Sequence, residues 1–421
     1  MIDFKEFTLD NGLRVIVHED FTTPMAVLNV LYDVGSKDEA EAQTGFAHLF
    51  EHLMFSGSVN IPDYDDPLQK VGGENNAFTS PDITNYYLSV PAQNIETGFW
   101  LESDRMLGLA FDDNGLEVQR KVVIEEFKQN YLNQPYGDVW LKLRPLSYEV
   151  HPYKWPTIGK EIAHIADARM EDVRSFFKRH YSPSNAILVV AGNVTFDQAR
   201  ALTEKWFGPI PAGNKYVRSL PQEPPRQQAK VLEHRANVPL TGIYKTYLMP
   251  GRTEANYFAT DLVSDILGRG KSSRLYDQLV KESKLFNSIS ASCSGSTDAG
   301  LLIIQGKLNE GVDAAIANAA IEAVTRQLMD HAVSEEELTK VKNQAEASIV
   351  FSEIELLNRA MNLAYSKLLG DTNLVNLETE QVQAVTVAEI RQQARAVLRP
   401  DNCSTLFYYA DPQAAETASA D

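Results

Sequence analysis

A proline-rich stretch divides this chain almost at its midpoint, and similar patterns stand on either side of it. The stretch "GPIPAGNKYVRSLPQEPPRQQ" (208–228) holds five prolines and two glycines and shows little apolar periodicity. Such a composition interrupts helices and strands and is typical of a linker. The 421 residues suffice for two or three domains. We therefore expect two halves joined by this linker.

The two halves share an order of elements. "TPMAVLNVLYDVGS" (23–36) and "VPLTGIYKTYLMPGR" (238–252) each contain a proline, an apolar β-run and a glycine, and a helical pattern follows each glycine. Each half closes with a helix-rich region and a short β-run, "NAILVVAGNV" (185–194) in the first and "NCSTLFYYAD" (402–411) in the second. This weak internal repeat predicts two similar α+β halves.

The repeat and the linker set the expected boundaries. These are residues 1–210 for the first half, 211–228 for the linker, 229–411 for the second half and 412–421 for a disordered tail. In the first half, Asn11-Gly12 between two alternating runs predicts a β-hairpin. Apolar residues at helical spacing predict helices over 44–55, 93–107, 114–133, 169–179 and 197–207.

Charge and composition exclude several classes of partner. The formal net charge of −18 argues against nucleic acid and anionic membrane surfaces, because phosphate groups bind to cationic faces. No apolar run approaches the ~18 residues of a membrane span, and the N-terminal residues lack the pattern of a signal peptide. We therefore expect a cytoplasmic protein, although a periplasmic chain whose export signal has been removed would look the same. The two cysteines, Cys293 and Cys403, form no metal-type or redox pair.

The first half carries a motif with metal-ligand spacing, since residues 48–52 read H-x-x-E-H. In a helix, positions i and i+4 lie on the same face, so His48 and His52 can bind one ion. Glu51 borders that face and can stand beside the metal without binding it. Metal-assisted hydrolysis needs such a carboxylate to take a proton from water and to deliver it to the leaving amine. A histidine pair on a helix is more often ordinary packing, so the assignment depends on a third ligand.

The segment "NGLEVQRKVVIEEFKQN" (114–130) offers two carboxylates as the third ligand. Its apolar face contains Val123 and Phe127, and Glu126 lies close to that face. Glu125 lies more toward the polar side, so Glu126 is the better candidate. The alternative is that both glutamates are a solvated pair on an exposed helix. The comparable helix of the second half, residues 256–270, contains no histidine.

The motif and its distance to Glu126 resemble a known family. H-x-x-E-H with a glutamate 74 positions after the second histidine resembles the inverzincins of the pitrilysin, insulinase and mitochondrial-processing-peptidase family, known as M16. The chain length resembles the short bacterial-type, M16B-like branch, in which two chains pair. The resemblance covers nearly the whole chain, through "NGLRVIV" (11–17), "GFAHLFEHLMFSGS" (45–58), "GGENNAFTSPDITNYY" (72–87), "QRKVVIEE" (119–126), "RHYSPSNAILVVAGNV" (179–194) and "GRGKSSRLYDQL" (268–279).

The resemblance implies a zinc metalloendopeptidase with one Zn²⁺ per chain. His48, His52 and Glu126 would bind the metal, and Glu51 would be the general base. Gln119 stands where family members often carry a glutamate, and we expect it near the ligands as a neutral hydrogen-bonding group. Each half would be a mixed, mostly antiparallel β-sheet packed with helices, the LuxS/MPP-like arrangement. The partners implied are peptide substrates and a second chain, in a homodimer or a heterodimer with a related M16-like chain that encloses a clamshell chamber.

The resemblance also suggests substrate-binding residues. Asn76, Ala77 and Phe78 would line an edge strand that binds an extended peptide by main-chain hydrogen bonds. The other interpretation of these three residues is a turn followed by a core strand. Arg274 and Tyr276 would grip substrate, but they share a face only if the segment is extended. A plain helical segment is the alternative for this pair.

Two other functions compete with a peptidase. The chain is either a non-catalytic subunit that supports a partner chain, or a zinc-stabilised module that captures peptides without hydrolysis. The complete H-x-x-E-H motif argues against the first. The second leaves the position of Glu51 beside the ligands without a reason. We therefore expect an endopeptidase that acts on short or unfolded peptides.

Overall fold

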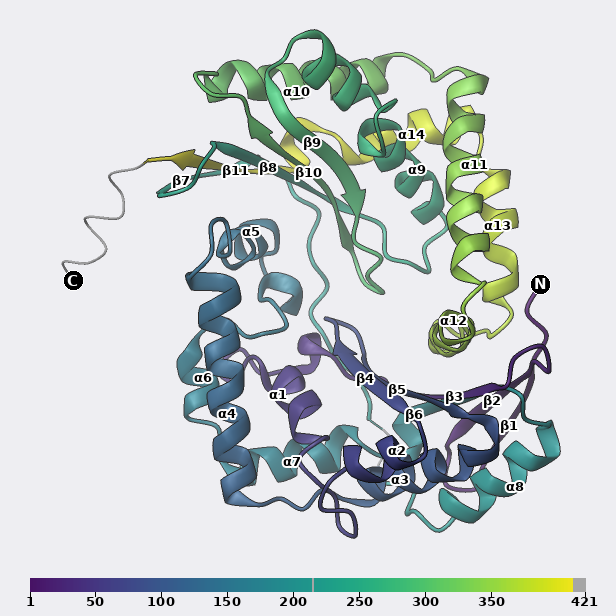
Figure 1. The fold of residues 1–421 in the computed structure, drawn as a ribbon. Helices are drawn as coiled ribbons and strands as arrows, with labels where there is room; N and C mark the ends of the chain where they lie inside the picture. Colours follow the sequence, from purple (N-terminus) through teal and green to yellow (C-terminus); the bar gives the residue numbers. More distant parts are fainter. Residues whose placement is uncertain (214–215, 412–421) are drawn as a thin grey trace. The chain divides into compact units, whose positions relative to one another are not determined.

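The computed structural model describes residues 1–213 and 216–411 (Figure 1). The strands of these residues form one sheet of six strands and one of five. The chain divides into two compact units, each assembled from separate segments. The first unit contains Met1–Gln129, Trp155–Leu220 and Ile349–Glu378. The second contains Asn130–Lys154, Pro221–Ser348 and the described residues from 379 onward.

The sheet of the first unit has the strand order β1-β2-β6-β3-β5-β4. Its strands are β1 (Lys5–Thr8), β2 (Arg14–Glu19), β3 (Met25–Tyr32), β4 (Glu74–Thr79), β5 (Thr84–Pro91) and β6 (Ala186–Gly192). Only β2 and β6 run parallel among these neighbours. The predicted hairpin is confirmed, because β1 pairs with β2 across a loop in which Gly12 has a φ of +87°.

The sheet of the second unit repeats this topology. Its order is β7-β11-β8-β10-β9, with only β7 and β11 parallel among the paired strands. The strands are β7 (Lys230–Ala236), β8 (Gly242–Met249), β9 (Phe286–Cys293), β10 (Gly300–Leu308) and β11 (Cys403–Ala410). This order matches β2-β6-β3-β5-β4 strand for strand. The predicted fold class, two similar halves with mixed and mostly antiparallel sheets, is confirmed.

The helices of the first half lie close to their predicted positions. They are α1 (Phe46–Leu53), α3 (Ile95–Leu107), α4 (Asp113–Phe127), α7 (Met170–His180) and α8 (Phe196–Trp206). The helix predicted to end at residue 133 is α-helical only to Phe127 and continues as a π-helical turn over Lys128–Leu132. The remaining α-helices are α2 (Asp65–Lys70), α5 (Val139–Ser147), α6 (Ile162–Ala166), α9 (Tyr257–Gly268), α10 (Ala314–Asp330), α11 (Glu335–Ser352), α12 (Leu356–Leu368), α13 (Leu374–Ala384) and α14 (Val387–Val397).

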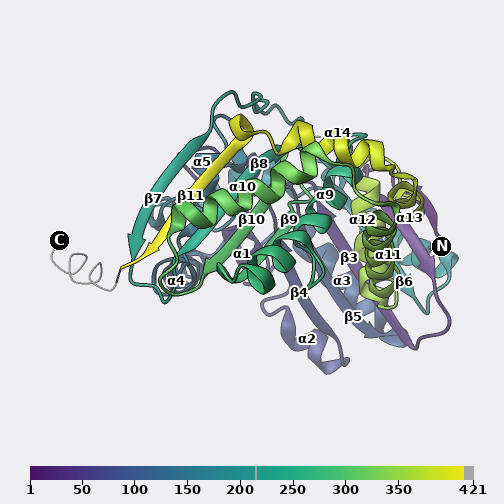
Figure 2. The ribbon, with the colours of Figure 1, turned by 90° about the horizontal axis from the view of Figure 1, so that it is seen from above.

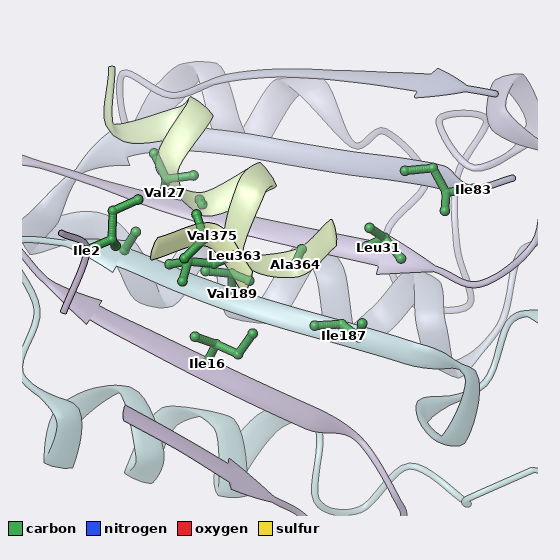
Figure 3. Close-up of a cluster of buried hydrophobic side chains, with 12 residues drawn as sticks. Ile2, Ile16, Val27, Leu31, Ile83, Ile187, Val189, Leu363, Ala364 and Val375 are labelled. Carbon is green, nitrogen blue, oxygen red and sulfur yellow. The ribbon is translucent and has the colours of Figure 1, made fainter. Parts of the chain in front are cut away.

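Helix α12 belongs to the second half of the sequence but packs on the sheet of the first unit (Figure 3). Leu363 and Ala364 of α12 are fully buried against the apolar face formed by β2, β3 and β6. The expected division at residues 211–228 did not anticipate this exchange. Residues 349–378 pack with the first half and residues 130–154 with the second, because the apolar faces of the sheets need helices from these segments. The predicted disordered tail, residues 412–421, lies outside the described residues.

Helices of the second unit cover its own sheet (Figure 2). Lys245 of β8 is 2% exposed, and its Nζ donates to Asn318 of α10 at 2.6 Å, which ties this helix to the sheet. The opposite face packs on α5 through Leu143 and Leu406. Across the described part of the chain, no helix is both long and apolar enough to cross a membrane.

Candidate metal centre

Helix α1 presents its polar side chains on one face because its other face is buried. Its N-terminal neighbour Gly45 has a φ of +88°, and a Cβ at this position would lie 2.6 Å from the carbonyl oxygen of Ile158. Glycine is therefore required where the chain enters the helix. The apolar face consists of Phe46, Ala47, Leu49, Phe50 and Leu53, all of which are buried. His48, Glu51 and His52 remain on the less buried side.

Helix α4 brings the third side chain to this face. The carboxylate of Asp112 caps the helix by accepting from the backbone N–H of Asn114 and Gly115. Val123 and Phe127 are buried, and this fixes the rotation of α4 about its axis. Glu126 is then turned toward α1, with which α4 is in contact.

His48, His52 and Glu126 meet at one point. Each offers one ligand atom, and these atoms all lie within 4.8 Å of one another. The Nε2 atoms of His48 and His52 lie 3.7 Å and 3.5 Å from Oε2 of Glu126. Glu125 is turned away, since its side chain is 70% exposed and forms an ion pair with Lys128 at 2.7 Å. The geometry therefore favours Glu126 over Glu125 as the third ligand; zinc binding itself stays a prediction.

The donor set fits zinc. Two imidazoles and one carboxylate, with room for a further ligand, are a common set for catalytic zinc. Burial lowers the pKa of His48 to about 4, an effect that Glu126 opposes and His52 reinforces. His48 is therefore neutral at physiological pH, the form that binds a metal. Its Nδ1 is buried and has no hydrogen-bond partner among the described residues, so the Nε2 that faces Glu126 carries the polar contact of this ring.

Glu51 lies next to this cluster and is held by a residue that the sequence interpretation missed. Thr79, at the end of β4, donates its hydroxyl to Oε2 of Glu51 at 2.5 Å. Burial raises the pKa of Glu51 above its ordinary value, although the Thr79 hydrogen bond and the charge of His52 oppose the shift. A carboxylate with a raised pKa is a better proton acceptor and donor near neutral pH. Strand alternation places Thr79 on one face of β4, but only the packing of β4 against α1 reveals that this face meets Glu51.

Strand β4 lies at the edge of its sheet and pairs only with β5 among the described strands. The backbone N–H of Ser80 donates to the carbonyl of Ile83, and the antiparallel alternation then turns the N–H and C=O of Ala77 to the open edge. The side chain of Asn76 accepts from the N–H of Ala77 at 2.8 Å. Phe78 is 39% exposed. These residues therefore form an edge strand, and the alternative of a turn and a core strand is wrong.

The other predicted residues lie in different surroundings. Gln119 on α4 donates its side-chain amide to the hydroxyl of Ser56 at 3.0 Å, which links α4 to the segment after α1. Arg274 and Tyr276 lie in the second unit, on a helical segment that continues as the π-helix Tyr276–Glu282. Arg274 forms a bidentate ion pair with Glu337 at 2.9 Å and 2.7 Å. Residues 274–276 are helical rather than extended, so the shared face of an extended segment is not formed; a role of Arg274 and Tyr276 in substrate binding stays a prediction.

Comparison with known proteins extends this description. A sequence model described as "Insulinase (Peptidase family M16)" matches residues 14–143, which contain His48, Glu51, His52 and Glu126. A model described as "Peptidase M16 inactive domain" matches residues 167–345, which contain none of the four. The zinc protease PqqE of Helicobacter pylori is 29% identical over 408 residues, which cover 95% of this chain and 91% of that protein.

Solved structures show the same relationship. A protease from Helicobacter pylori superposes with a TM-score of 0.90 at 26% identity, covering 97% of this chain and 100% of that one. Pitrilysin shares the fold with a TM-score of 0.78 at 18% identity, and the match covers 97% of this chain but 45% of the pitrilysin chain. The family models for both halves, the repeated sheet topology and the similarity over the whole chain agree, and we conclude that this chain belongs to peptidase family M16.

Proposed function

We propose that this chain is a zinc-dependent endopeptidase that hydrolyses short or unfolded peptides. The observation that carries the proposal is the meeting of His48, His52 and Glu126 at one point, with Glu51 beside them on α1. Relatives that match over nearly the whole chain are named zinc proteases. A subunit without activity would have no need for all four side chains in this arrangement.

Each side chain of the proposed site has a separate role in peptide hydrolysis. When zinc is bound by His48, His52 and Glu126, it supplies the Lewis acidity that activates water and a peptide carbonyl. Glu51 takes the proton of the attacking water and later delivers it to the nitrogen of the leaving amine. Thr79 holds the Glu51 carboxylate in one orientation through its hydroxyl. Burial favours the protonated form of Glu51, and this assists the first proton transfer, from the attacking water to the carboxylate.

Strand β4 gives the proposed substrate its conformation. A peptide can add to the open edge by bonding to the N–H and C=O of Ala77, provided that the Asn76 side chain leaves this N–H. Thr79 lies two residues further along the strand and contacts Glu51, so a peptide on this edge lies close to the base. Main-chain hydrogen bonds to β4 require an extended substrate, and they discriminate little between substrates with different side chains. The site therefore suits unfolded peptides better than folded proteins.

The proposal extends to pairing of two chains around an enclosed chamber. The chain aligns with less than half of pitrilysin, so two copies together would supply the length of that longer chain. A homodimer or a heterodimer with a related chain would then exclude folded proteins by size. The mass of the purified protein in solution, followed by its activity alone, tests this part. A fully active monomer would contradict it.

The experiment that tests the function uses Glu51→Gln, which is close in size to the glutamate. We expect this variant to keep about one zinc per chain and to lose several orders of magnitude in the cleavage rate of a quenched unfolded peptide, because the water loses its proton acceptor. A His48→Ala/His52→Ala double variant should lose both zinc and activity. A wild-type chain that binds zinc but cleaves no peptide would favour the peptide-binding module, and one that binds no zinc would favour the non-catalytic subunit.

A further inference from the structure

The N-terminal turn of α1 is held by a carboxylate that the mechanism above does not use. A helix leaves its first N–H groups without partners in the helix, and Gly45 has no side chain that could cap them. Glu39, six residues upstream, fills this role. Its Oε2 accepts from the backbone N–H of Gly45 at 2.9 Å, and its Oε1 accepts from the N–H of Ala47 at 2.8 Å.

A third donor reaches Glu39 from a distant segment. The indole Nε1 of Trp155 lies 3.1 Å from Oε2 of Glu39 and 3.0 Å from the carbonyl oxygen of Ser36. Trp155 is the residue at which the chain re-enters the first unit. Glu39 therefore joins three parts of that unit: its own loop, the first turn of α1 and the segment that starts at Trp155.

The contacts require two acceptor oxygens, which a carboxyl group supplies in its ionised and in its neutral form. Glu39 is 8% exposed, and no cationic side chain lies within ion-pair distance of it among the described residues. An amide at this position would turn an NH₂ group toward the N–H of Gly45 or Ala47. Burial raises the pKa of Glu39 to about 8, against the effect of its three hydrogen bonds. The ionised form is thus less stable in the fold than in water, and charge stabilisation of the fold does not explain this glutamate.

The turn that Glu39 holds contains His48, the first of the two histidines proposed to bind the metal. Ala47 directly precedes His48, and His52 follows one helical turn later. Helix α1 has eight residues, and a helix this short depends on tertiary contacts for its position. A small rotation of its first turn would swing both imidazoles away from Glu126, which lies on a different helix.

We propose that Glu39 is a positioning residue of the metal centre, which fixes the rotation of α1 so that His48 and His52 face Glu126. The inference rests on the proposed zinc site. It predicts a defect in metal binding that exceeds any loss of stability. Residues that orient metal ligands from outside the coordination sphere typically change metal affinity by about tenfold to a hundredfold when replaced.

The test compares full-length Glu39→Gln and Glu39→Asp with Leu363→Ala, which destabilises the same unit at the buried face of α12. The zinc dissociation constant is measured by competition with a chromophoric chelator. The visible spectrum of the Co²⁺-substituted protein reports the ligand geometry, and thermal unfolding reports stability. We expect Glu39→Gln to weaken zinc binding by about tenfold or more and to alter the Co²⁺ spectrum. Glu39→Asp, which keeps two acceptor oxygens, should lie closer to wild type.

Leu363→Ala is the control that separates loss of stability from loss of metal binding. It should lower the unfolding midpoint while leaving zinc affinity and the Co²⁺ spectrum unchanged. Wild-type affinity and spectrum in Glu39→Gln would overturn the inference, as would an equal loss of affinity in Leu363→Ala. If Glu39→Gln does not fold, wild-type zinc binding by a folded Glu39→Ala variant would overturn it equally. Failure of wild type itself to bind zinc would instead overturn the proposed function.

Discussion

The segment exchange between the two halves predicts that the first half cannot fold alone. A fragment of residues 1–220 contains the whole six-stranded sheet and all four proposed site residues, but it lacks residues 349–378, which belong to the same compact unit. Without α12, the apolar face of β2, β3 and β6 is open to water. We expect this fragment to be unfolded or aggregated, and we expect a fragment with residues 349–378 appended through a flexible linker to fold.

The structure gives the magnitude of the effect. The sheet contributes five large aliphatic side chains to the shared cluster, and α12 adds Leu363, which is fully buried. Fully burying one such side chain stabilises a fold by about 1.5–3 kcal/mol, and loss of α12 exposes only part of each, so the total is on the order of 5–10 kcal/mol. The five are Ile16, Val27, Leu31, Ile187 and Val189. A whole domain is typically stable by only about 5–15 kcal/mol, so the loss is comparable to its entire stability.

Circular dichroism melts, size-exclusion profiles and zinc binding of the two fragments form the assay. Both fragments contain residues 130–154, so any defect from that segment is common to them. The extended fragment should melt cooperatively and bind zinc, and Leu363→Ala within it should cost about 2–5 kcal/mol. Val350→Ala, at a side chain that is 53% exposed, should change little. A cooperative melt and zinc binding by residues 1–220 alone would refute the reasoning.

Three further predictions address the site and the core. Glu126→Gln should weaken zinc binding strongly and Glu125→Gln should leave it unchanged, as measured by chelator competition; the reverse pattern would move the third ligand to Glu125. Thr79→Val should lower kcat by about tenfold or more at unchanged zinc content, because Glu51 loses its hydrogen bond, and Thr79→Ser should restore most of the rate; equal rates would deny Thr79 this role. Burial lowers the pKa of His180 to about 3, so the unfolded chain takes up this proton first as the pH falls, and about 5 kcal/mol of stability is lost between pH 6.5 and 3. In His180→Phe, followed by unfolding midpoints across this range, the acid-induced loss should be smaller than in wild type, and an identical pH profile would contradict the assignment.

Local sequence patterns were sufficient to predict much of the fold and part of the proposed site. The H-x-x-E-H spacing places His48 and His52 on one helical face because the α-helix has a fixed period, and no tertiary contact is needed for that step. The hairpin around Gly12 and the helices of the first half follow from turn residues and apolar periodicity in the same way. The repeat of "Pro, β-run, Gly" was enough to predict two similar sheets, since each half has to bury one apolar face in the same manner.

Only the tertiary structure revealed the features that depend on contacts between residues far apart in the chain. Glu125 and Glu126 are neighbours on one helix, and only the packing of Val123 and Phe127 turns Glu126 toward α1. Thr79 and Glu39 approach α1 from a strand and a loop whose local patterns carry no sign of a metal site. The exchange of residues 349–378 is likewise invisible in the sequence, because an apolar helix face does not specify which sheet will cover it. Apolar periodicity predicts that one face of a helix will be buried. Only the three-dimensional packing of the chain determines which sheet or helix that face contacts.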